Sequence, residues 1–136
     1  MKRMVQGILC IIWLSLTGCA TQTSMREEFD RSVKGYNRML RWHELENAGM
    51  TYIDPELRGE YLKQADILKR RGLSVTDYRI LSTLCVPEKK TGEAIAEFDY
   101  YMLPSNRVKT ISYRQEWAYQ EETKNWKLKS GLSPFE

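Results

Sequence analysis

Few residues of this 136-residue chain could carry out chemistry, so their types and spacing limit what it can do. The sequence has three cysteines (Cys10, Cys19 and Cys85) and one histidine, His43. No cysteines or histidines are paired at the spacing of a zinc site, no glycine-rich loop could cradle a phosphate, and no serine lies in a nucleophile elbow. We therefore predict no metal, no cofactor and no catalytic residue.

Cys19 follows an N-terminal segment of unusual composition. Lys2 and Arg3 give the first six residues a positive charge, and residues 7–16 are almost entirely apolar. An apolar run of this length fits the roughly 7–15 residues of a secretory signal and is shorter than the ~20 that a membrane-spanning helix needs. The run has no polar stripe, so it does not suit a helix on the surface of a soluble domain.

Leu16, Thr17, Gly18 and Cys19 form the order aliphatic, small, small, cysteine. This order resembles the lipobox of bacterial lipoproteins. The resemblance implies cleavage of a signal peptide (residues 1–18), acylation of Cys19 and attachment to membrane lipid in the bacterial cell envelope. Ala20, where an Asp would imply retention in the inner membrane, points to the outer membrane and a periplasm-facing domain. An ordinary secretory signal is the alternative.

Removal of residues 1–18 leaves 19 basic residues against 18 acidic ones. A nearly neutral protein gives no reason to expect nucleic acid as a partner. The remaining length suits a lipidated N-terminus and tether over residues 19–28 and one α+β domain over residues 29–136. Cys85 then has no cysteine to pair with, and we expect it to be a partly buried apolar residue.

The domain begins with two stretches of helical periodicity. Ser24 and Glu27 have the spacing of a capping box, so the first helix is predicted to begin at Met25, and Ala48-Gly49 to end it. Asp54-Pro55-Glu56 predicts the start of a second helix, which Gly72 ends. The residues that recur at helical steps are Phe29, Val33, Tyr36, Leu40 and His43 in the first helix, and Leu57, Tyr61, Ala65 and Leu68 in the second.

After Gly72 the apolar period changes to two, which predicts four strands. The segments are residues 75–86, 94–103, 108–120 and 126–130, and residues 131–134 are expected to end the fold as a tail. Each of the sheet strands has one apolar and one polar side. The sequence therefore predicts an α+β fold, with N-terminal helices packed on one face of a curved four-stranded antiparallel meander.

Helices followed by a meander that ends in a Trp-rich hairpin, with Trp117 and Trp126, resemble the cone-shaped fold of nuclear-transport-factor-two-like proteins. The resemblance covers most of residues 29–130 and implies a cavity between the helices and the concave sheet face. Aromatic stripes at such positions are more often simply core. The residues predicted to line such a cavity are Tyr36, Leu40, His43, Tyr61, Phe98, Tyr100, Tyr113 and Trp117.

Three hypotheses for function follow. The first is a non-enzymatic binding or accessory domain in the envelope, with a protein partner or a small ligand. The second is a cavity enzyme of the isomerase or dehydratase type with His43 as base, although Glu97 and Asp99 should point away from the cavity. The third is a purely structural envelope component. The polar strand faces could form a cross-strand charge ladder, pair as ordinary surface charges, or pair with a second copy as a homodimer. Their charged residues are Arg79, Glu97, Asp99, Arg114, Glu116, Lys127 and Lys129.

Overall fold

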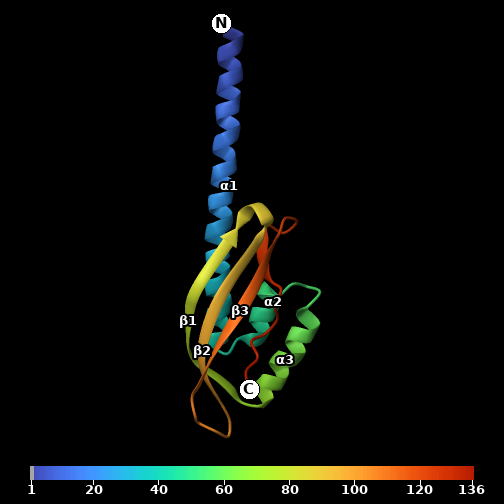
Figure 1. Ribbon diagram of the computed structural model, residues 1–136. Coiled ribbons are helices and arrows are strands. Elements are labelled where there is room, and N and C mark those ends of the chain that lie inside the picture. Colours follow the sequence, from blue (N-terminus) through green and yellow to red (C-terminus); the bar gives the residue numbers. More distant parts are fainter. Residues whose placement is uncertain (1) are drawn as a thin grey trace.

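The computed structural model describes the backbone of residues 2–136 and the side chains of residues 21–136, and it has an α+β fold (Figure 1). Within these residues, α-helices precede a four-stranded antiparallel sheet of strand order β1-β2-β3-β4, as predicted. The elements are α1 (Lys2–Arg41), α2 (Leu45–Tyr52), α3 (Arg58–Arg70), β1 (Leu73–Val86), the short 3₁₀ helix η1 (Pro87–Lys89), β2 (Thr91–Met102), β3 (Lys109–Gln120) and β4 (Asn125–Leu128).

The N-terminal part of α1 differs from the predicted tether. Residues 21–24 are helical, because α1 begins at Lys2, so the capping box at Ser24 does not start a helix. The signal peptide of residues 1–18 and the lipidation site at Cys19 lie outside the residues whose side chains are described. Within the described part of the chain, no helix combines the length and apolar character needed to cross a bilayer.

The predicted apolar stripe of α1 is buried from Phe29 to Leu40, but the helix ends earlier than expected. His43 has a φ of 63°, which stops the helix two residues after Arg41. The Glu44 N–H bonds the Met39 carbonyl at 2.9 Å and the His43 N–H bonds the Leu40 carbonyl at 3.2 Å. This pair of bonds is a Schellman motif, with His43 at the left-handed position that glycine usually takes.

Gly49, predicted to end the first helix, lies inside the additional helix α2. A Cβ at this position would lie 2.5 Å from the Tyr61 ring, so the glycine permits α2 and α3 to approach closely. Asp54 does not cap a helix directly, because α3 begins at Arg58. The end of α3 is as predicted. Gly72 follows it with a φ of 77°, and the Gly72 N–H donates to the Lys69 carbonyl.

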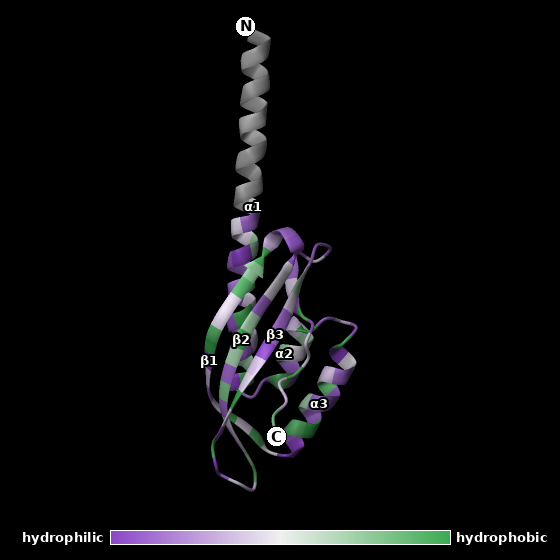
Figure 2. Cartoon of the chain, viewed as in Figure 1, coloured by the Kyte–Doolittle hydropathy of each residue, from purple (hydrophilic) through white to green (hydrophobic). Residues whose placement is uncertain are grey.

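The sheet has the predicted alternation, and its inner face packs against the helices. Ala94, Ala96, Phe98 and Tyr100 of β2 are buried, while their neighbours face outwards. The register pairs Ala96 with Tyr113 across β2 and β3. Figure 2 shows hydrophilic and hydrophobic residues mixed along these strands, as a sheet with one covered face requires.

Both edges of the sheet are partly covered. At the β1 edge, Arg26 and Arg41 of α1 donate to the carbonyls of Cys85 (3.1 Å) and Val75 (3.2 Å). β1 also has register shifts at two places, and such bulges discourage pairing with other chains. At the other edge, Ile53 forms a parallel bridge with Leu128 of β4.

The C-terminal segment is part of the core, which corrects the prediction that residues 131–134 form a tail beyond the fold. Leu132 and Phe135 are 7% and 4% exposed. The Phe135 ring lies 4.9 Å from that of Tyr100 and 5.6 Å from that of Phe98, centroid to centroid. Figure 1 shows this red segment passing between β3 and α3. The segment therefore fills space between the helices and the sheet that the cone resemblance assigned to a cavity.

Candidate functional site

The structure brings together seven of the eight residues predicted to line a cavity. Tyr36 and Trp117 are 0% and 2% exposed, and their rings meet edge to face with centroids 5.9 Å apart. Tyr113 is half-buried, and the other members of the group are buried. These residues form a packed aromatic core under the C-terminal segment. The members are Tyr36 and Leu40 from α1, Tyr61 from α3, Phe98 and Tyr100 from β2, and Tyr113 and Trp117 from β3.

The phenol groups of Tyr36 and Tyr61 in this core are held in their neutral form. Burial is the main cause that raises the pKa of Tyr36 well above its usual value, and the nearby Tyr61 is the second cause. Burial also raises the pKa of Tyr61. Both phenols therefore stay protonated. Among the described residues, their hydroxyls and the Trp117 indole N–H have no partner with hydrogen-bond geometry.

A buried amide pair beside this core was not predicted from the sequence. The Gln115 Nε2 donates to Asn37 Oδ1 at 2.7 Å, and the Asn37 Nδ2 donates to Gln115 Oε1 at 3.1 Å. Asn37 also donates to the Val33 carbonyl at 2.8 Å. Both side chains are 0% exposed. The alternation of side chains along β3 could have revealed this pair. Gln115 lies two residues before Trp117 and therefore on the same, inward face of the strand.

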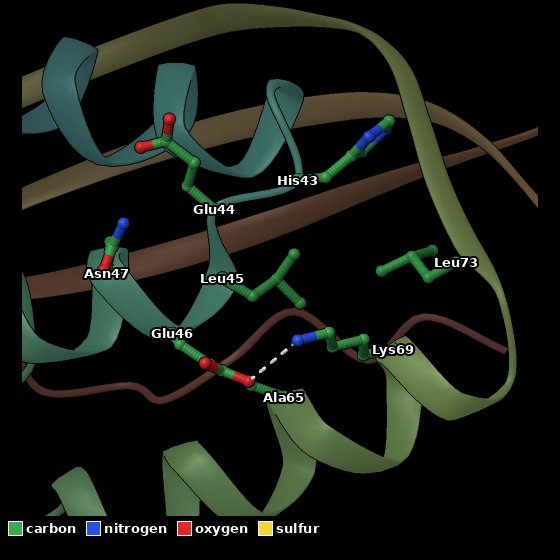
Figure 3. A pocket seen from close by; sticks show the side chains of 8 residues that line it. All are labelled: His43, Glu44, Leu45, Glu46, Asn47, Ala65, Lys69 and Leu73. Carbon is green, nitrogen blue, oxygen red and sulfur yellow. Dashed lines mark hydrogen bonds and ion pairs between the residues drawn. The ribbon is translucent and has the colours of Figure 1, made fainter.

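His43, the eighth predicted residue, lies apart from this core on the exposed turn between α1 and α2. Its Nε2 lies 3.3 Å from the Ser74 Oγ. The turn borders a hollow of about 220 Å³, the His43 hollow, in which Lys69 reaches Glu46 at 3.4 Å while His43 and Glu44 extend away from that ion pair (Figure 3). The hollow is lined by His43, Glu44, Leu45, Glu46, Asn47, Ala65, Lys69 and Leu73.

This position corrects the expectation that His43 lines the cone cavity, where it could act as a base. The left-handed turn directs residue 43 off the apolar face of α1, so the ring is outside the aromatic core. The His43 hollow instead offers groups of both charges and the apolar floor of Leu45 and Leu73, which suits weak contact with a small polar molecule. Among the described residues, no three His, Cys, Asp or Glu side chains gather as metal ligands could.

Cys85 is half-buried at the end of β1, as expected. Burial raises the pKa of its thiol, against the opposing effect of Arg26. A raised pKa keeps the sulfur protonated, and the thiol is the less nucleophilic form. The environment of Cys85 is that of a packing residue.

The outer sheet face carries the charge ladder that the sequence predicted. The Arg79 guanidinium donates to Glu97 Oε1 at 2.8 Å and to both carboxylate oxygens of Asp99 at 3.1 Å. Thr110 donates to Asp99 at 2.7 Å. The hydrogen bonds from Arg79 and Thr110 lower the pKa of Asp99. One guanidinium thus faces the carboxylates of Asp77, Glu97 and Asp99, so this cluster keeps a net negative charge.

Comparisons with known proteins identify a fold and no family. Neither protein families nor curated proteins give a match to this chain. Among solved structures, the chain is similar to the crystal structure of the intermembrane space region of the chloroplast protein ARC6, with a TM-score of 0.53 and 14% sequence identity. The similarity covers 79% of this chain and 94% of the ARC6 chain. At this identity the two proteins share an architecture, and the likeness carries no function.

Proposed function

We propose that this protein is a lipid-anchored lipoprotein of the bacterial envelope whose α+β domain binds a partner and does not catalyse a reaction. The observation that carries the proposal is the order Leu16, Thr17, Gly18, Cys19 after an apolar run. One acyl chain gives only marginal membrane binding, at about 0.8 kcal/mol per buried methylene, whereas the two or three chains of lipoproteins anchor stably. Ala20 favours the outer membrane.

The distribution of reactive groups supports binding over catalysis. The sole histidine lies on an exposed turn beside Ser74, away from the buried tyrosines. The raised pKa values of Tyr36 and Tyr61 make poor acid–base groups of these phenols at neutral pH. What the domain offers a partner is surface: the outer sheet face and the His43 hollow.

The anchor is tested with Cys19→Ala, and Cys85→Ala serves as the matched control because it removes the other thiol of the mature chain. The proposal expects incorporation of labelled palmitate and membrane fractionation for the wild type and for Cys85→Ala. Cys19→Ala should take up no label and keep its signal peptide. Equal behaviour of all three proteins, or unlabelled wild type with residues 1–18 intact, would refute the lipoprotein assignment.

The partner-binding role is tested by photo-crosslinking in intact envelopes. A crosslinker at Ser112 probes the exposed sheet face and one at Asn47 probes the His43 hollow, with the exposed Lys34 on α1 as a reference position. A specific adduct from one of the first two positions would support a partner, and an adduct of doubled mass from Ser112 would identify a homodimer. A purely structural component would give adducts from many positions at equal yield.

A further inference from the structure

The C-terminal segment, residues 131–136, occupies a cleft made by α3 and the inner face of β2 and β3. Leu132 and Phe135 are the apolar side chains that the segment buries there. Phe135 packs edge to face on Tyr100 and Phe98, at 4.9 and 5.6 Å between ring centroids. We call residues 131–136 the tail and the surface beneath it the tail cleft. The cleft has two apolar sockets, three residues apart along an extended chain.

Two tyrosines hold the tail by its backbone. Tyr113 Oη lies 2.7 Å from the carbonyl oxygens of both Ser130 and Gly131, which share its single proton. Tyr100 Oη donates to the main-chain oxygen of Glu136 at 3.2 Å and accepts from its N–H at 3.3 Å. Because these bonds involve main-chain atoms, the cleft could hold other extended segments in the same way.

The tail fits its cleft imperfectly. The Ser133 hydroxyl is buried, and among the described residues it has no hydrogen-bond partner, which disfavours this occupant. A hollow of about 260 Å³ remains between the tail and α3, where Ile67 is still 43% exposed beside Leu68. A segment with an apolar residue in place of Ser133, or a larger one against Ile67, would fill the cleft better.

The tail also has a point about which it can turn. Gly131 has a φ of 76°, and a Cβ built there would meet no atom within 4 Å. β4 ends before it, at Leu128, and Lys129 pairs with Glu116 through a 2.7 Å main-chain bond. Rotation at Gly131 would therefore release the tail and leave the sheet paired.

Positive charge at the Glu136 end of the cleft favours an acidic residue in the bound segment. Arg71, Arg107 and Lys109 border a hollow of about 450 Å³ next to Glu136, and the Lys109 Nζ donates to the Glu136 main-chain oxygen at 3.0 Å. Three cations around this end favour an acidic residue directly after the aromatic one, as Glu136 follows Phe135 in the tail.

We propose that the tail cleft is a binding site for an extended peptide segment of a partner protein, and that the chain's own tail occupies it until the partner displaces it. The segment carries two apolar side chains three residues apart, the second aromatic, followed by an acid. This inference rests on the binding role proposed above and not on the lipid anchor.

The test uses the full chain in detergent and a fluorescent heptapeptide of residues 130–136. Leu132→Ala/Phe135→Ala empties both sockets, and Val108→Ala is the control because it truncates an exposed apolar residue outside the cleft. Fluorescence anisotropy should show at least tenfold tighter binding to the double variant than to wild type or to Val108→Ala. A peptide with alanine at the Ser133 position should bind more tightly. Replacing its acidic residue with lysine should weaken binding in a salt-dependent way.

A cooperatively folded double variant that does not bind the peptide would overturn the proposal. If the double variant does not fold, native-state hydrogen exchange on the wild type tests the proposal instead. The amides of Leu132 and Phe135 should exchange well before those of β2. Exchange of these two amides only on global unfolding would overturn the proposal. A wild-type dimer with exchanged tails would replace the partner by a second copy and so overturn the assignment. Cys19→Ala should bind like its parent, so failure of the anchor and failure of the cleft are distinguishable.

Discussion

At the scale of single residues, Asp54 is the carboxylate most enclosed by partners. It is 5% exposed and accepts hydrogen bonds from Lys129 Nζ at 2.9 Å, Gln120 Nε2 at 3.0 Å and the Glu56 N–H at 3.0 Å. The Lys129 bond is the main cause of a lowered pKa, and the backbone bond adds to it. Asp54 thus ties the connection between α2 and α3 to β3 and to the segment after β4.

We predict that Asp54→Asn lowers the free energy of unfolding by about 1.5–3 kcal/mol at pH 7, because hydrogen bonds to a charged group are lost. A lowered folded-state pKa gives stability that is present above the unfolded value of about 3.9 and lost as pH falls through the folded value. Urea denaturation should therefore show the difference between wild type and variant shrinking below about pH 4. Asp66→Asn, which breaks an exposed pair with Arg70, should cost less than about 1 kcal/mol. A pH-independent difference for Asp54→Asn would contradict the assignment.

The Asn37–Gln115 amide pair gives a second prediction at this scale. Asn37→Leu or Gln115→Leu alone leaves a buried amide without its partner, at a cost of roughly 1–3 kcal/mol each. The double substitution removes both amides, so we expect its cost to fall below the sum of the single costs. Chemical denaturation of the four proteins measures this coupling. Strict additivity would show that the pair does not act as a unit.

At the scale of elements, α1 docks on the sheet through a ring placed over a glycine. A Cβ on Gly92 of β2 would lie 2.3 Å from the Phe29 ring, and the Phe29 ring also packs at a tilt against Trp126, with ring centroids 5.0 Å apart. Gly92→Ala should therefore destabilise the fold by about 1–3 kcal/mol through overpacking. Gly59→Ala in α3 is the matched control, because a Cβ there meets nothing within 4 Å. The control should stabilise by about 0.4–1 kcal/mol, and thermal melts that give both variants the same sign would contradict this account.

At the scale of the whole molecule, residues from every α-helix, every strand and the tail share one hydrophobic core. Trp117 and Trp126 lie in this core, at 2% and 1% exposed, between α1 and the sheet. We predict a single cooperative unfolding transition in which near-ultraviolet and far-ultraviolet circular dichroism coincide. Two separated transitions would show that α1 or α3 unfolds independently of the sheet.

Periodicity was enough to predict the α+β class, the buried stripe of α1 and the alternation of β2, because these patterns follow from which faces must avoid water. The end of α1 was predicted wrongly. The left-handed residue was assigned to Gly49 because glycine adopts that conformation most easily, but the structure places it at His43 and uses Gly49 for close packing against Tyr61.

The candidate site was also predictable only in part. Burial of residues such as Tyr36 and Phe98 follows from their periodic positions, and the structure has them in the core. Whether they line a cavity depends on what else fills the space between the helices and the sheet. That answer came from Leu132 and Phe135, whose segment has no periodicity and lies far from α3 in the chain.

The sequence by itself determined that helices precede four strands, which faces of α1 and β2 are buried, and the motif on which the anchoring proposal depends, because these are local properties of composition and spacing. Tertiary structure alone decided that His43 lies outside the core, that Asn37 meets Gln115, and that the tail occupies the cleft. These contacts join residues far apart in the chain, and they depend on shape and packing, which no local pattern encodes.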